Sequence, residues 1–112
     1  MNINHEIKAA YEAGQKAVED MYAPVYQAWA NYWEWHDATF AIVLEKGKLL
    51  ARSIEHLPDD DPQRESVLQQ SWELFLSFDR ECVQKSNAIK KLHEECDAGV
   101  SKLLTYKRKK WL

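Results

Sequence analysis

Two histidines, His36 and His93, each have a carboxylate or sulfur group nearby in the sequence. Side chains of these types at these spacings could bind a metal ion. His93 and Cys96 are three positions apart, a spacing that brings two side chains to one face of a helix. His36 and Asp37 could face them across a helical hairpin. Structural zinc sites use paired ligands at both ends, however, and no second Cys or His lies at a matching offset. We therefore predict no metal ion and no cofactor.

The patterns that mark catalytic sites are also missing. Trp33, Ser53 and Lys90 stand three positions before the last three histidines, so the Glu-x-x-His pattern of di-iron bundles does not occur. The sequence has neither a Gly-x-Ser-x-Gly elbow nor a glycine-rich phosphate loop. Cys82 and Cys96 fall on apolar positions of one expected helix, where thiols are normally inert. The sequence predicts a protein that is not an enzyme.

The elements that would position these residues are long helices. The 112 residues include only three Gly and three Pro, too few for the many turns of a β-sandwich or barrel. The segment Leu57–Pro62 places two prolines around three aspartates, with Asp61 suited to cap a helix and Pro62 to begin it. Pro24 removes a hydrogen bond inside the first helix and predicts a kink. We expect one all-α domain over 1–112, an antiparallel hairpin with arms over 3–56 and 62–110 and a turn over 57–62.

Apolar residues repeat along both arms at the spacing of a coiled coil. Steps of four and three residues define a seam in the second arm at Leu68, Ser71, Phe75, Phe78, Cys82, Lys85, Ile89, Leu92, Cys96, Gly99, Leu103 and Tyr106. A period of 3.5 residues held over several heptads is typical of helices that pack along their length.

The first arm carries a second apolar stripe beside its seam, at Ala28, Trp35, Ile42 and Leu49. One helix contact cannot bury two adjacent stripes, so this arm needs another helix against it. A hairpin alone also buries little surface against the entropy of its chain. We expect a dimer that forms a four-helix bundle, and both a homodimer and a bundle with a different protein fit the pattern.

The aromatic run of the first arm is the most unusual feature of the sequence. Packing inside the bundle is one explanation, because helical stripes of aromatic residues usually form cores. The other is a binding surface for a protein partner, since Trp and Tyr dominate interface energetics. We predict a protein-protein interaction module acting as an adaptor, inhibitor or assembly subunit. The expected partner-binding residues are Trp29, Tyr32, Trp33, Trp35, Ile42 and Leu49.

The C-terminus suggests an alternative, a nucleic-acid-associated subunit of a larger complex. Consecutive cations with an aromatic neighbour suit phosphate contacts supported by stacking. The residues concerned are Lys107, Arg108, Lys109, Lys110 and Trp111. The net charge of −3 does not suit general nucleic-acid binding. The N-terminus lacks the pattern of a signal peptide and no segment has the roughly 18 apolar residues of a membrane span, so we expect a cytoplasmic protein.

Overall fold

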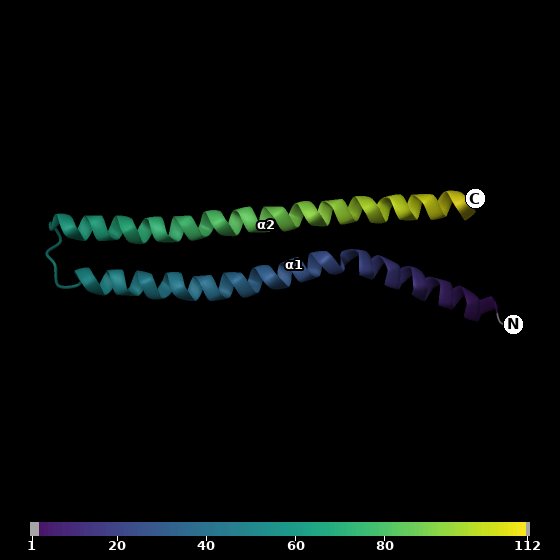
Figure 1. The fold of residues 1–112 in the computed structure, drawn as a ribbon, viewed down its shortest axis with the longest axis horizontal. Coiled ribbons are helices and arrows are strands. Elements are labelled where there is room, and N and C mark those ends of the chain that lie inside the picture. Colours follow the sequence, from purple (N-terminus) through teal and green to yellow (C-terminus); the bar gives the residue numbers. More distant parts are fainter. Residues whose placement is uncertain (1–2, 112) are drawn as a thin grey trace. The chain divides into compact units, whose positions relative to one another are not determined.

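The computed structural model describes the backbone of residues 3–111 and the side chains of 3–106 and 108. These residues form two helices, α1 (Ile3–Ile54) and α2 (Pro62–Trp111), and no strand. The helices run in opposite directions on either side of the turn (Figure 1). The predicted all-α hairpin is confirmed, and α1 ends two residues before the expected end of the first arm.

Backbone and side-chain hydrogen bonds close the turn. The Leu57 amide donates to the carbonyl of Ile54 at 3.0 Å. The Gln63 amide donates to Oδ1 of Asp61 at 2.8 Å, so Asp61 is the expected N-cap of α2. Arg64 donates through Nη1 to the carbonyls of Ile54 and Leu57, each at 3.1 Å. These bonds pair the Ile54 carbonyl at the end of α1 and the Leu57 carbonyl in the turn.

The hairpin divides into two compact units. Unit 1 comprises Met1–Ala30 and Ala88–Leu112, and unit 2 comprises Asn31–Asn87. Among the described residues, the buried hydrophobic side chains are Val25, Ile89 and Val100 in unit 1 and Val43 and Ile54 in unit 2. Each unit therefore has a core only one seam wide.

Before Phe78, the seam of α2 departs from the predicted one at two positions, and at each the half-buried residue is the preceding neighbour of the predicted one. Val67 and Leu74 are half-buried, whereas Leu68 and Phe75, which the 3.5-residue period assigned to the seam, are exposed. Both neighbouring stripes are apolar here, so periodicity alone does not choose between them. The seam then continues through Phe78 and Cys82, as expected. The displaced residues form a second apolar stripe on α2.

In unit 1 the helix α1 bends without breaking. Pro24 lies inside the helix and cannot donate to the carbonyl of Asp20. Figure 1 shows α1 bending in this region, so that its first turns diverge from the last turns of α2. The divergence opens a cleft of about 690 Å³ between the two helices. The cleft is lined by Ala10, Tyr11, Gly14, Gln15, Val18, Glu19, Leu103 and Leu104.

Candidate protein-binding face

An aromatic cluster around Phe78 organises one part of unit 2. The ring of Phe78 projects from α2 and lies 5.8 Å from Trp35, 5.3 Å from His36 and 5.9 Å from Phe40, measured between ring centres. His36 and Phe40, one turn apart on α1, stack on each other with an angle of 10° between their planes. The cluster thereby restrains Phe40, which is itself exposed at the side of the seam.

Phe75 joins the two helices on the same side of the seam as Phe40. A Cβ atom placed on Gly47 would lie 3.2 Å from Cζ of Phe75, so the Phe75 ring lies directly against the backbone of α1. Gly47 follows Phe40 by seven residues, and residues seven apart share a helix face. Phe40 and Phe75 therefore belong to one continuous surface formed by both helices.

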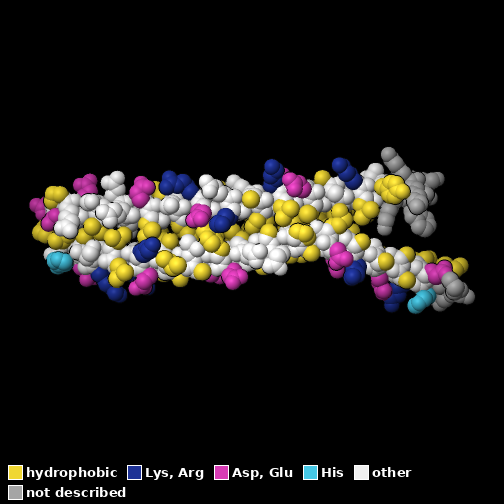
Figure 2. Space-filling view, in the orientation of Figure 1, with side chains coloured by type: hydrophobic (Ala, Val, Ile, Leu, Met, Phe, Trp, Pro, Cys, Tyr) yellow, Lys and Arg dark blue, Asp and Glu magenta, His cyan; other side chains and the backbone are white. Residues whose placement is uncertain are grey.

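The spacing of exposed apolar residues extends this surface along both helices. On α1, residues at heptad or one-turn intervals from Phe40 lie on the same side, and on α2 the same holds for residues three, seven and eight positions from Phe75. We call this surface the outer aromatic face; it comprises Trp33, Phe40 and Leu44 of α1 and Leu68, Trp72, Phe75 and Val83 of α2, all exposed. In the space-filling view, hydrophobic side chains gather where the helices meet and also reach the outer surface (Figure 2).

The opposite flank of unit 2 holds most of the second stripe predicted for the first arm. Trp35 is half-buried because it stacks on Phe78, and the ammonium nitrogen of Lys85 lies 4.7 Å from the centre of its ring. Ile42 and Leu49 are exposed. A shallow hollow of about 440 Å³ beside Leu49 is lined by Lys46, Leu49, Leu50, Ser53, Gln70 and Leu74. Polar groups from both helices, Lys46, Ser53 and Gln70, thus border this flank.

The predicted partner-binding residues differ in burial and in position along α1. Tyr32 is half-buried, with its ring 5.1 Å from that of Trp33. Burial raises the pKa of Tyr32, and a hydrogen bond with Cys82 raises it further. Trp29 is half-buried and belongs to unit 1. Of the predicted set, only Trp33 lies on the outer aromatic face.

The four residues that α2 contributes to this face were missed by the sequence reasoning. The 3.5-residue period predicts Leu68 and Phe75 in the seam of α2, and it does not include Trp72 or Val83. A signal was present, because Val67 and Leu68 are adjacent, as are Leu74 and Phe75. Adjacent apolar pairs at heptad spacing indicate a stripe wider than one seam.

A polar cluster in unit 1 accounts for the residues considered as metal ligands. The Tyr22 hydroxyl donates to the carboxylate of Asp97, and Nε2 of His93 lies 3.6 Å from Oδ1 of the same carboxylate. The hydrogen bond to Asp97, followed by burial, raises the pKa of Tyr22 to about 12. Cys96 donates instead to the carbonyl of Met21, with 3.4 Å between Sγ and the oxygen. His93 and Cys96 therefore have different partners within unit 1.

Other candidate metal ligands are paired locally as well. Nδ1 of His36 lies 3.1 Å from Oδ1 of the adjacent Asp37. Among the described residues there is no group of three His, Cys, Asp or Glu side chains that could hold a metal ion. In the same part of the chain, neither helix has a stretch apolar and long enough to cross a bilayer.

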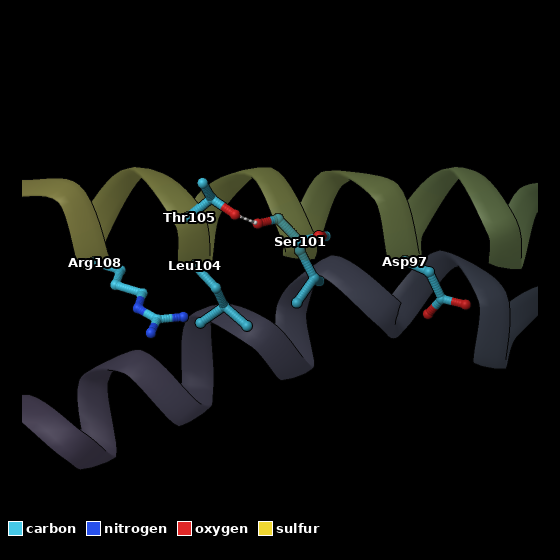
Figure 3. A pocket seen from close by; sticks show the side chains of 6 residues that line it. Asp97, Ser101, Leu104, Thr105 and Arg108 are labelled. Atoms are coloured by element: carbon cyan, nitrogen blue, oxygen red, sulfur yellow. Dashed lines mark hydrogen bonds between the residues drawn. The ribbon is translucent and has the colours of Figure 1, made fainter.

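The basic residues considered for nucleic-acid binding fall at the end of α2. Its backbone continues through them, but the side chains of Lys107, Lys109, Lys110 and Trp111 lie outside the described part of the structure. Arg108 lines a hollow of about 300 Å³ with Asp97, Val100, Ser101, Leu104 and Thr105. Figure 3 shows Asp97, Leu104 and Arg108 projecting from α2 on the side of α1. Because one wall of this hollow carries a carboxylate, it is poorly suited to a phosphate group.

Comparisons with known proteins add no further evidence. A scan against protein-family models, a search of curated proteins and a search of solved structures each found no match to this chain.

Proposed function

We propose that this chain is a non-enzymatic protein-protein interaction module whose outer aromatic face binds a protein partner, so that it acts as an adaptor, inhibitor or assembly subunit. The observation that carries the proposal is the exposure of seven large apolar residues, two of them Trp, on one side of unit 2. Folded monomers rarely expose contiguous apolar patches larger than a few hundred Å² without a binding role.

The composition of the face supports this role. Trp33 and Trp72 are 52% and 65% exposed, and Trp is the residue most enriched among those that dominate binding energy. The two indoles come from different helices, so a partner that contacts both would bury the surface between them. Apolar surface removed from water contributes about 25 cal/mol per Å², before the cost of association is subtracted.

The packing beneath the face also favours binding. Phe40 is restrained by His36 and Phe78, and Phe75 lies against the backbone at Gly47. Side chains already held in place lose less rotamer entropy when a partner covers them. These contacts place the face on a supported surface formed by two helices.

Cross-linking in cells tests the proposal with two matched variants. Trp72→Glu puts a charge in the outer aromatic face, and Leu49→Glu puts the same charge on the opposite flank. We expect wild type and Leu49→Glu to cross-link to the same proteins, and Trp72→Glu to lose them because binding would bury an unpaired carboxylate. Equal cross-linking by all three chains, with unchanged circular dichroism, would contradict the proposal.

A further inference from the structure

We infer that the occupant of the outer aromatic face is a second copy of this chain, so that two hairpins pack face to face through unit 2 as a four-helix bundle. The inference rests on the proposed function, because it names the partner of the same face. Four-helix bundles are built by layering helices in this way, with short connections between antiparallel neighbours.

The exposed area matches what a stable pair of proteins needs. From their exposed fractions and typical side-chain areas, the seven residues present about 700 Å² per copy, and standard interfaces bury about 800 Å² per partner. A second copy would supply an equal apolar area, so the pair would bury a total within the usual range for stable interfaces. A short peptide would leave part of such a face exposed.

The thin core of unit 2 gives a physical reason for a second layer. Among its described hydrophobic side chains only Val43 and Ile54 are buried. Ordering each residue costs about 1–2 kcal/mol of backbone entropy, and a core of this size offsets little of that cost. A layer over the outer aromatic face would turn its exposed side chains into a second core.

The face has features that are complementary to each other, as a two-fold interface requires. Large side chains, Leu68 and Trp72, stand on α2, whereas Ala51, seven residues after Leu44, places a small exposed side chain on α1. A two-fold pairing can set a large residue of one copy against Ala51 of the other.

Charged residues of both signs lie along the face. Lys48 follows Leu44 by one turn on α1; on α2, Glu65 precedes Leu68 by about one turn, and Asp79 lies between Phe75 and Val83, one turn from each. All three side chains are exposed. Pairing the face with itself therefore brings opposite charges within reach instead of like charges alone.

Light scattering behind size exclusion, in the presence of reductant and from about 1 to 100 µM chain, tests the inference directly. We expect the wild-type chain to have twice the 13.2 kDa mass of one copy across this range. The reductant excludes a pair held by Cys82 or Cys96, both of which are free.

Two leucine variants locate the interface. Leu68 and Leu49 are each 55% exposed, and only Leu68 lies on the outer aromatic face. We expect Leu68→Glu to raise the dissociation constant of the dimer by about 100-fold or more, and Leu49→Glu to change it by less than about threefold. Loss of helicity together with the dimer in Leu68→Glu alone also supports the inference, because an exposed residue contributes little to the fold of a single copy.

Two outcomes would overturn the inference. One is a folded wild-type monomer at every concentration, and the other is a dimer that survives Leu68→Glu or is lost in Leu49→Glu. The proposed function fails separately, through the cross-linking comparison of Trp72→Glu with Leu49→Glu. A monomer whose cross-linked partners disappear in Trp72→Glu would retain the proposed function and exclude the second copy as occupant.

Discussion

Unit 1 and unit 2 use the same pair of helices and the same kind of seam, but they differ in what flanks it. In unit 2 the flank is apolar and aromatic, and Phe75 lies against the α1 backbone. In unit 1 the flank carries a polar cluster, in which Asp97 accepts from Tyr22 and lies close to His93. The comparison teaches that a heptad seam defines a helical pair, whereas the residues beside it determine what the pair can bind.

The units also differ at their ends. Unit 2 contains the turn, where Arg64 donates to the carbonyls of Ile54, at the end of α1, and Leu57, in the turn. Unit 1 has a cleft where the first turns of α1 diverge from α2. Hydrogen bonds at a chain reversal hold two helix ends together, whereas the cleft separates the first turns of α1 from α2. We expect the α1 amides beside the cleft to exchange their hydrogens faster than the hydrogen-bonded amides of the turn.

Removing a buried side chain from each seam should produce the largest effect. Ile54 in unit 2 and Ile89 in unit 1 are 4% and 8% exposed. We expect Ile54→Ala and Ile89→Ala each to lower the free energy of unfolding by about 2–4 kcal/mol, because each leaves a cavity. Urea denaturation measures this, with exposed Ile42→Ala as the control at below about 1 kcal/mol. A negligible cost for Ile89→Ala alone would show that the seam of unit 1 does not stabilise the fold.

The two half-buried tyrosines should titrate late for different reasons. The hydrogen bond to Asp97 is the main cause of the Tyr22 pKa of about 12, whereas burial is the main cause of the raised pKa of Tyr32. We expect Asp97→Asn to lower the pKa of Tyr22 toward 10 and to leave that of Tyr32 unchanged. Carbon NMR of labelled tyrosine rings measures both, with Tyr22→Phe and Tyr32→Phe to assign the signals.

The sign of the pH dependence follows from these values. A phenol with a higher pKa in the folded than in the unfolded chain binds its proton more tightly when folded. The stability contributed by Tyr22 is therefore fully present below pH 10 and is lost as the pH rises from 10 to about 12. In Tyr22→Phe this loss should be smaller; an unchanged alkaline profile would contradict the assignment.

Replacing one glycine in each unit with alanine should change the free energy of unfolding by about 1 kcal/mol or less, and by different amounts in the two units. A Cβ on Gly14 in unit 1 would meet no atom within 4 Å, so Gly14→Ala should stabilise the helix by about 0.5–1 kcal/mol. A Cβ on Gly47 would lie 3.2 Å from the Phe75 ring, which has to move to admit it. We expect Gly47→Ala to gain less than Gly14→Ala in thermal unfolding. An equal gain would mean that Phe75 does not lie against α1.

The contact between Lys85 and Trp35 should have the smallest effect. A cation above an indole at a partly exposed site contributes about 0.5–1 kcal/mol. A double-mutant cycle of Lys85→Gln and Trp35→Leu isolates this energy from the loss of packing. We expect a coupling of that size in unfolding experiments, and additive effects would exclude the interaction.

Much of the fold could be predicted from sequence because its signals are local. Asp61 caps α2 and Pro62 begins it, as their side-chain chemistry indicates. Pro24 marks the bend of α1 for an equally local reason. The candidate site was less predictable, since only Trp33 of the expected residues lies on the outer aromatic face. Trp35 was expected on a binding surface, but it is half covered by Phe78 and Lys85 from the other helix.

The sequence by itself determined the helices, the turn and the presence of more apolar surface than one seam can bury. These properties depend on residues close together in the chain, through capping, proline geometry and periodicity. Only the tertiary structure decided that Val67 and Leu74 enter the seam while Leu68 and Phe75 remain outside it. The choice between neighbouring stripes depends on how side chains of α2 fit α1, including the Phe75 ring against Gly47, and that fit belongs to the pair of helices together.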